Sequence, residues 1–316
     1  MPRAVVATAY TGPDGIGVID VESIPASAGQ VVIAVRATAL NPWDLKQAKG
    51  AMGTDPAKLP MRLGAEASGV VTAMGEDAVG LEGQPLQVGD EVFGYPFAGA
   101  QASELTVKAA DVLIKPIGVG FEQAAGLLLT GTTAVHGLEA VQVSSGDTLL
   151  IHGVSGSVGA LAAQLAALRG ARIIGTAAPA RHDALRALGI VPVAYGDGLL
   201  ERVKEAAPEG ISAALDTVGT DEALAVSLEL LDDPSRFVTI ANAAAALAAG
   251  GQAIGAAPGA DRGTEIRSAA RLELAKLIGE GKLHVTVSAT YPLEHAADAY
   301  AELAEGHAGG KIVLTV

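Results

Sequence analysis

Short runs of alternating apolar and polar residues fill the first third of the chain. They occur at 31–35, 69–72 and 90–94, and Gly, Pro and Asp residues separate them. Alternation with a period of two is typical of strands that bury one face. We therefore expect an antiparallel or barrel-like β domain within residues 1–115.

The pattern changes near residue 121, where apolar positions take helical spacing and alternate with short apolar runs. This alternation of helix and strand predicts a doubly wound parallel sheet. The Ala/Gly-rich segment 243–259 has no clear periodicity. Helices are predicted at 121–129, 132–141 and 267–279, and strands at 148–152, 171–176, 191–194, 212–216 and 236–241.

The chain ends in an apolar run, 311–316, that no helix follows. A terminal strand of this kind is expected to pair with the first β domain, which makes that domain discontinuous. The predicted organisation is therefore one α/β chain with two domains. Residues 1–120 and 258–316 form the β domain, and residues 121–257 form the domain with the parallel sheet.

Three glycines form a turn between the strand at 148–152 and the helix that follows it. Gly153, Gly156 and Gly159 are spaced G-x-x-G-x-x-G, the helix carries leucines at 161, 165 and 168, and a second apolar strand begins near residue 171. A glycine turn at the start of a βαβ unit can seat a dinucleotide pyrophosphate on the helix N-terminus. A glycine-rich turn without a ligand is the alternative.

The end of the second strand indicates which dinucleotide is bound. NAD-selective sites place Asp or Glu there, whereas this chain has Ala177, with no carboxylate before Asp183. Arg181 can bind a 2′-phosphate through paired N–H groups, which favours NADP(H). Arg181 could instead face solvent, and whether Arg181 or His182 contacts the phosphate is left open.

Composition narrows the possible partners. A net charge of −14 argues against nucleic acid and anionic membranes, and the absence of cysteine excludes disulfides and thiolate metal sites. No stretch of 18 apolar residues and no signal peptide is present. We expect a soluble, cytoplasmic protein that acts on a small molecule.

Motifs along nearly the whole chain resemble the medium-chain dehydrogenase/reductase superfamily, in its zinc-free quinone oxidoreductase (zeta-crystallin-like) branch. The resemblance implies a GroES-like β-barrel catalytic domain, a Rossmann domain, an active-site cleft between them and a homodimer. It also implies NADPH-dependent reduction of quinones or α,β-unsaturated carbonyls. The matching segments are 41–46, 64–71, 88–94, 129–134, 145–153, 215–219 and 310–314.

Zinc-using relatives carry Gly-His-Glu where this chain has Gly64-Ala65-Glu66. The six histidines show no ligand pairing at short spacing, so no metal site is predicted. Without a Lewis acid, alcohol oxidation becomes less plausible than hydride addition to a conjugated acceptor.

The resemblance also assigns roles to single residues. Asn41 and Asp44 would lie near the nicotinamide ribose and the substrate, and Lys46 would donate to a substrate oxygen. Some quinone reductases have tyrosine at the position of Lys46, so the source of the proton is open. The Asn41-Pro42 pair could also be a simple turn. The implied cofactor contacts are Thr130, Gly153, Ser155, Gly156, Ser157, Val158, Gly159, Ala177, Arg181, Tyr195, Val218 and Lys311.

Two other functions remain compatible with the sequence. One is an enoyl or double-bond reductase of a biosynthetic pathway, and the other is an NADPH-binding protein with little turnover. The lining of the acceptor pocket cannot be read from one chain, so the acceptor itself is not predicted.

Overall fold

The computed structural model describes residues 1–306 and 308–316 and divides the chain into two compact units. Unit 1 comprises Met1–Leu129 and Leu272–Val316, and unit 2 comprises Thr130–Arg271. The domain boundaries expected from the sequence, at 120/121 and 257/258, lie earlier in the chain than the boundaries between these two units, at 129/130 and 271/272. Helices α3 (Leu128–Ala140) and α9 (Thr264–Gly279) each run across a boundary, so neither boundary coincides with a loop.

The larger sheet of unit 1 has the strand order β15-β16-β3-β5-β6-β8, and β7 also pairs with β3. Its ladders are antiparallel, except that β15 and β16 run parallel. The terminal strand β16 pairs with β3, with Val313 opposite Ala39, as the sequence predicts. The strands are β3 (Gln30–Ala39), β5 (Ala67–Met74), β6 (Glu91–Gly94), β7 (Glu104–Lys108), β8 (Val112–Ile114), β15 (Val287–Pro292) and β16 (Lys311–Thr315).

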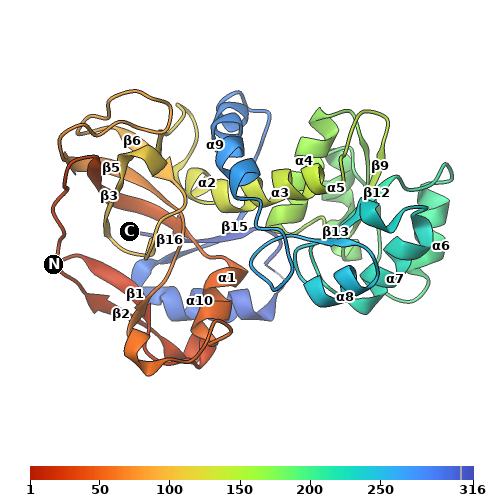
Figure 1. Cartoon of the computed structure of the whole chain (residues 1–316), viewed down its shortest axis with the longest axis horizontal. Helices are drawn as coiled ribbons and strands as arrows, with labels where there is room; N and C mark the ends of the chain where they lie inside the picture. Colours follow the sequence, from red (N-terminus) through yellow and green to blue (C-terminus); the bar gives the residue numbers. More distant parts are fainter. Residues whose placement is uncertain (307) are drawn as a thin grey trace. The chain divides into compact units, whose positions relative to one another are not determined.

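A second, three-stranded sheet of unit 1 has the order β2-β1-β4. Helix α10 packs against β2 and against α1 (Figure 1). Its buried residue Tyr300 belongs to the apolar cluster that also contains Leu314. These elements are β1 (Arg3–Ala7), β2 (Ile16–Asp20), β4 (Met61–Arg62), α1 (Pro42–Ala48) and α10 (Ala296–Glu305). Helix α2 (Phe121–Ala125) packs instead against β3 and β5 of the larger sheet.

Unit 2 is built on a six-stranded parallel sheet with the order β11-β10-β9-β12-β13-β14. The strands are β9 (Thr148–His152), β10 (Arg172–Thr176), β11 (Val191–Val193), β12 (Ala213–Asp216), β13 (Phe237–Thr239) and β14 (Gln252–Ala253). The helices between them are α4 (Ser157–Leu168), α5 (His182–Ala187), α6 (Leu199–Ala206), α7 (Asp221–Leu230) and α8 (Ala243–Ala248) (Figure 1).

The strand order of this sheet reverses at β9, which has β10 on one side and β12 on the other. In open parallel sheets, ligands bind outside the carboxyl ends of the strands at such a point. The doubly wound sheet predicted from the sequence is thus confirmed, and the segment after β9 is where a ligand is expected. None of the helices that the structure describes is long and apolar enough to cross a membrane.

Candidate functional site

The glycine turn in unit 2 connects β9 to the N-terminus of α4. Gly153 takes a left-handed conformation with φ +77°, and its N–H donates to Thr176 Oγ1 at 3.0 Å. A methyl group on Gly159 would lie 2.4 Å from the carbonyl oxygen of Gly153, so the turn packs tightly on the first turn of the helix. Two of the three predicted glycines are therefore required by backbone geometry.

The first turn of α4 is suited to an anion. Gly156 is the N-cap and provides no side chain to cap the helix, and the first helical bond runs from the Ala160 N–H to the Gly156 carbonyl at 2.9 Å. The N–H groups of Ser157, Val158 and Gly159 precede that bond, and such groups bind phosphate well. These N–H groups belong to residues that are predicted from the sequence to contact the pyrophosphate, and the assignment stays a prediction.

His152 comes immediately before this turn and is buried. Its Nε2 lies 2.9 Å from Ser227 Oγ. Burial lowers the pKa of His152 to about 4, against the opposing effect of the Asp216 and Glu222 charges. The ring is therefore neutral near pH 7 and adds no cation beside the turn.

The segment after β10 contains a small residue, Ala177, followed four positions later by the positively charged Arg181. Ala177 is buried, and its carbonyl oxygen lies 3.2 Å from His182 Nε2. Arg181 is exposed, and among the described residues its side chain makes no hydrogen bond or ion pair. Arg181 is therefore available to a phosphate group, whereas one ring nitrogen of His182 already has a partner.

Two large apolar side chains are exposed where β11 and β12 end. Tyr195 is 55% exposed after the partly buried strand β11, and Val218 is 48% exposed after the fully buried strand β12. Asp216 fixes the second of these segments, because its Oδ1 accepts the N–H of Val218 and of Gly219, each at 2.9 Å. The exposed surfaces of Tyr195 and Val218 could contact a planar base and its ribose.

Thr130, a predicted cofactor contact, lies in α3 and is buried.

Asp216 was not among the residues predicted to take part in the site. Its only signal in the sequence is the Asp-Thr-Val-Gly run at the end of a strand, where an Asp side chain commonly bonds backbone N–H groups two or three residues later.

Unit 1 holds a buried ion pair between Glu66 and Lys311, and Lys311 is one of the residues predicted to contact the cofactor. Lys311 Nζ donates to Glu66 Oε1 at 2.9 Å, to Asn41 Oδ1 at 2.7 Å and to the Leu40 carbonyl at 3.2 Å. Glu66 also accepts from Asn41 Nδ2 at 3.2 Å and from the Leu129 N–H at 2.8 Å. Both charges are almost fully buried, and both are hydrogen-bonded several times. This arrangement fixes the orientation of the Asn41 amide.

Asp44 lies beside this cluster, at the start of α1, and is 1% exposed. Its Oδ2 accepts the Asn41 N–H at 2.9 Å, whereas its Oδ1 has no hydrogen-bond partner among the described residues. Burial raises the pKa of Asp44 to about 7, although the Asn41 N–H and the Lys311 charge act in the opposite direction. Asp44 can therefore hold a proton near neutral pH.

A hydrogen-bonded pair adjoins Asp44. Tyr300 OH donates to Gln101 Oε1 at 2.9 Å, and Gln101 Nε2 lies 3.5 Å from Asp44 Oδ2. Burial raises the pKa of Tyr300 well above the ordinary value for tyrosine, so its phenol stays protonated. Lys46 follows Asp44 on the same helix but is exposed, and no hydrogen bond joins its side chain to this cluster within the described part of the chain. Sequence reasoning missed Gln101 and Tyr300, which belong to distant segments.

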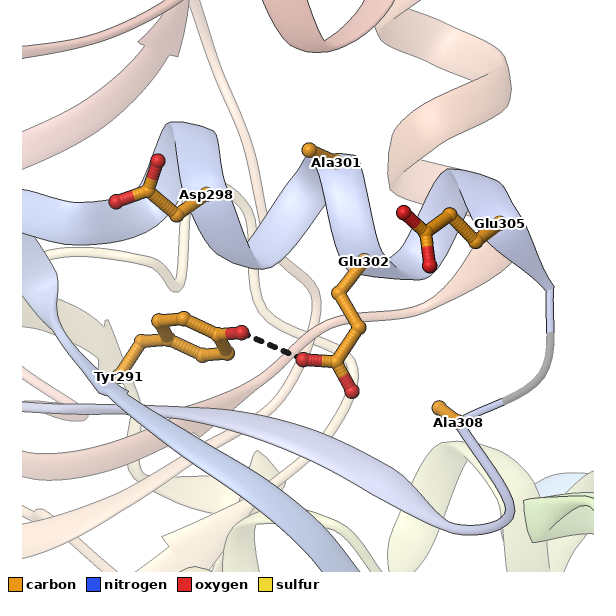
Figure 2. A pocket seen from close by; sticks show the side chains of 6 residues that line it. All are labelled: Tyr291, Asp298, Ala301, Glu302, Glu305 and Ala308. Carbon is orange, nitrogen blue, oxygen red and sulfur yellow. Dashed lines mark hydrogen bonds between the residues drawn. The ribbon is translucent and has the colours of Figure 1, made fainter.

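A cavity of about 520 Å³ lies elsewhere in unit 1, between β15 and α10 (Figure 2). Asp298, Glu302 and Glu305 line it, and Tyr291 OH donates to Glu302 Oε2 at 2.5 Å. Three carboxylates repel an anionic dinucleotide, so this cavity is excluded as the cofactor site.

Two family descriptions match the chain. Residues 27–136 match the alcohol dehydrogenase GroES-like domain, and residues 190–314 match the zinc-binding dehydrogenase family. A quinone oxidoreductase from Coxiella burnetii is 28% identical, with a TM-score of 0.81 over 100% of this chain and 99% of that one. The chain belongs to the medium-chain dehydrogenase/reductase superfamily. Its solved neighbours place it in the quinone oxidoreductase branch that the sequence indicates.

Other members of the superfamily show the range of its relatives. The mycobacterial protein Rv1454c, solved in complex with NADPH, is 27% identical with a TM-score of 0.83, and each chain is covered completely. The CurK enoyl reductase is 25% identical with a TM-score of 0.84, over 99% of each chain. The spectinabilin polyketide synthase protein NorB of Streptomyces orinoci is 33% identical over all of this chain, which spans 15% of that relative.

One of the matching families is described as zinc-binding, so the question is whether this chain has the side chains that a zinc site needs as ligands. The sequence has no cysteine, and Ala65 precedes Glu66. Glu66 itself is bound to Lys311, and the described residues contain no group of three His, Asp or Glu side chains that could hold a metal. The donor set does not fit a zinc site.

Proposed function

We propose that this chain is an NADPH-dependent reductase that transfers hydride to a quinone or an α,β-unsaturated carbonyl without a metal ion. The observation that carries the proposal is the glycine turn at the N-terminus of α4, together with Arg181 after the neighbouring strand β10, which is exposed and unpaired among the described residues. No carboxylate stands at the end of β10, where NAD-selective sites need one.

The residues of unit 2 bind the cofactor in this proposal. The N–H groups of Ser157, Val158 and Gly159 hold the pyrophosphate, and Ser155 lies at its edge. Arg181 binds the 2′-phosphate through two N–H bonds, and Tyr195 and Val218 contact the adenosine. The small side chain of Ala177 leaves room for the phosphate. It is also neutral, whereas a carboxylate at this position would repel the phosphate. Thr130 and Lys311 remain predicted contacts.

Asn41, Asp44 and Lys46 act at the acceptor. When bound, the reduced nicotinamide supplies the hydride to a carbon that the acceptor's own carbonyl activates. Asn41 uses one amide hydrogen on Glu66, and its second one donates to the acceptor oxygen as negative charge develops there. Lys46 Nζ supplies the proton that completes reduction. Asp44 fixes the start of the helix that carries Lys46.

The test is steady-state oxidation of NADPH and of NADH with a panel of quinones and enones, with and without EDTA. We expect turnover with NADPH, a preference over NADH of at least tenfold, and no effect of the chelator. Lys46→Ala should lower kcat by roughly 10²-fold or more with little change in NADPH affinity. Lys58→Ala, which also removes an exposed lysine, is the control. Binding of NADPH without turnover would leave only a cofactor-binding protein.

Arg181→Ala tests the cofactor assignment. It should weaken NADPH binding about tenfold or more and leave NADH binding nearly unchanged, because only NADPH carries the 2′-phosphate. The matched control is Arg186→Ala, in which the lost arginine pairs with Asp183 on the same helix. Equal losses for the two cofactors would refute the assignment of Arg181.

An enoyl reductase is the second candidate. It is supported by the similarity to the CurK enoyl reductase and by complete coverage of this chain in a polyketide synthase protein. Enoyl thioesters distinguish the two activities: a higher kcat/KM for a crotonyl thioester than for every quinone in the panel would favour this second candidate. The homodimer and the cytoplasmic location stay predictions, and light scattering tests the first.

A further inference from the structure

All three guanidinium nitrogens of Arg202, on α6, donate hydrogen bonds to one short segment of the chain. Nε donates to the Ala194 carbonyl at 2.9 Å, Nη1 to the Asp197 carbonyl at 2.8 Å and Nη2 to the Gly196 carbonyl at 2.7 Å. Segment 194–198 connects β11 to α6, and it carries Tyr195. Three carbonyls of this segment therefore turn toward one cation.

Glu222 holds the same segment from a different helix. Its Oε2 accepts the Gly196 N–H at 3.0 Å, and it lies in the first turn of α7. Helix α7 follows the segment that carries Val218, whose N–H is bound by Asp216. Glu222 thus ties together the segments that follow β11 and β12, which carry the two exposed apolar side chains.

The contacts from Arg202 and Glu222 hold a segment that would otherwise be flexible and that carries an exposed tyrosine. Gly196 and Gly198 have φ values of +91° and +79°, which give the segment little conformational preference of its own. Tyr195 is 55% exposed, so core packing does not hold it in place. The neighbouring strand β10 leads to Arg181, and the parallel pairing of β10 with β11 brings these two strand ends together. The fixed segment therefore holds an exposed aromatic residue just after the end of β11, at the same edge of the sheet as the segment that leads to Arg181.

We propose that Arg202 is a positioning residue for cofactor recognition: it touches no part of the dinucleotide, and it fixes segment 194–198 so that Tyr195 meets the 2′-phosphorylated ribose. Glu222 completes the brace. The inference rests on the proposed NADPH function. It adds a residue that determines cofactor affinity through the backbone and has no contact with the phosphate.

The first test measures hydrogen exchange in the protein without cofactor. Arg202→Met keeps the apolar stem and removes all three donors, so amide exchange in residues 194–198 should accelerate at least tenfold. Arg172→Met is the matched control, because Arg172 donates to the Ala206 carbonyl at the other end of the same helix. Unchanged exchange in the Arg202 variant, or equal acceleration in both variants, would overturn the inference.

The second test measures the dissociation constant for NADPH. Arg202→Met should raise it about tenfold, Arg202→Lys less, and Arg172→Met not at all. In kinetics the loss should appear mainly in KM, whereas a general loss of folded enzyme would lower kcat. Because Arg202 acts through Tyr195, adding Arg202→Met to Tyr195→Ala should weaken binding less than twofold further.

Additive effects of the two substitutions would overturn the positioning role. Equal NADPH affinities of the wild type and Arg202→Met would overturn it while leaving the cofactor proposal intact. Failure of the wild-type protein to bind NADPH would refute the cofactor proposal, and the inference with it.

Discussion

Lys311 stabilises the buried cluster of unit 1 through three acceptors that come from two other segments. The ammonium group satisfies Glu66, Asn41 and the Leu40 carbonyl at once. Removal of one member of a buried ion pair leaves an uncompensated charge, which costs far more free energy than the intact pair contributes. The same three bonds fix the amide that is proposed to face the acceptor.

Lys311→Met should therefore lower the free energy of unfolding by about 3–5 kcal/mol, because the Glu66 carboxylate loses its counter-charge. Urea denaturation measures the change. The double variant Lys311→Met/Glu66→Gln removes the unpaired charge and should regain part of the loss. A single variant within 1 kcal/mol of the wild type would contradict this reading of the cluster.

Asp44 should make stability depend on pH. Its pKa in the folded protein, about 7, lies above the unfolded value near 3.8, so the folded state binds an extra proton between these values. The stabilising contribution is complete below pH 4 and is lost as the pH rises through 7. We expect Asp44→Asn to lose less stability than the wild type between pH 5 and pH 8 in urea denaturation. Equal slopes would show that Asp44 is ionised throughout.

The convergence of these residues could not be predicted from the sequence. Lys311 is 270 positions from Asn41, and Tyr300 is 199 positions from Gln101. Sheet register and helix packing bring them together, and neither leaves a local signal in the sequence. Asn41 and Asp44 could be named because segment 41–46 resembles a family motif, whereas the capping contact that links them became visible only in the structure.

At the scale of elements, the glycine turn was predictable because its geometry is local. A strand, three glycines and an apolar helix follow one another within thirty residues, so no distant contact is needed to recognise them. Segment 243–259 was not predictable, because alanine and glycine give no apolar periodicity. The structure forms α8 and the two-residue strand β14 there, and the edge of the sheet determines that strand.

Gly159→Ala should destabilise the connection between β9 and α4. The added methyl would lie 2.4 Å from the Gly153 carbonyl oxygen, so the turn must shift, at a cost of about 1–3 kcal/mol. Differential scanning calorimetry should show a lower Tm. Gly156→Ala is the control, since its methyl comes no closer than 3.3 Å to the same oxygen. An equal Tm for both variants would contradict the tight packing of this turn.

At the scale of the whole molecule, the two units carry buried groups with opposite responses to acid. Asp44 in unit 1 favours the folded state at low pH, whereas His152 in unit 2 opposes it. The pKa of folded His152, about 4, lies below the ordinary 6.5, so the unfolded state binds more protons between these values. The stability that neutral His152 permits is present above pH 6.5 and is lost toward pH 4.

His152→Asn should therefore make unit 2 less sensitive to acid. Hydrogen exchange in β9 and β12, corrected for the intrinsic rate at each pH, should rise less between pH 7 and pH 4.5 in the variant than in the wild type. Strands β3 and β16 of unit 1 serve as the internal reference, because they lie far from His152 in the sequence and belong to the other unit. The same acid response in wild type and variant would exclude His152 as its source.

The placement of β16 between β15 and β3 has a consequence for biosynthesis. A ribosome releases all of Thr130–Arg271 before Leu272–Val316 emerges, so unit 2 can fold while the rest of unit 1 is still being made. Unit 1 has to wait, because the Ala37–Ala39 part of one edge of β3 stays unpaired until β16 is made, whereas β7 already pairs with Gln30–Ala34. A nascent chain of this protein therefore needs protection from edge-to-edge association for the time that synthesis of the central unit takes.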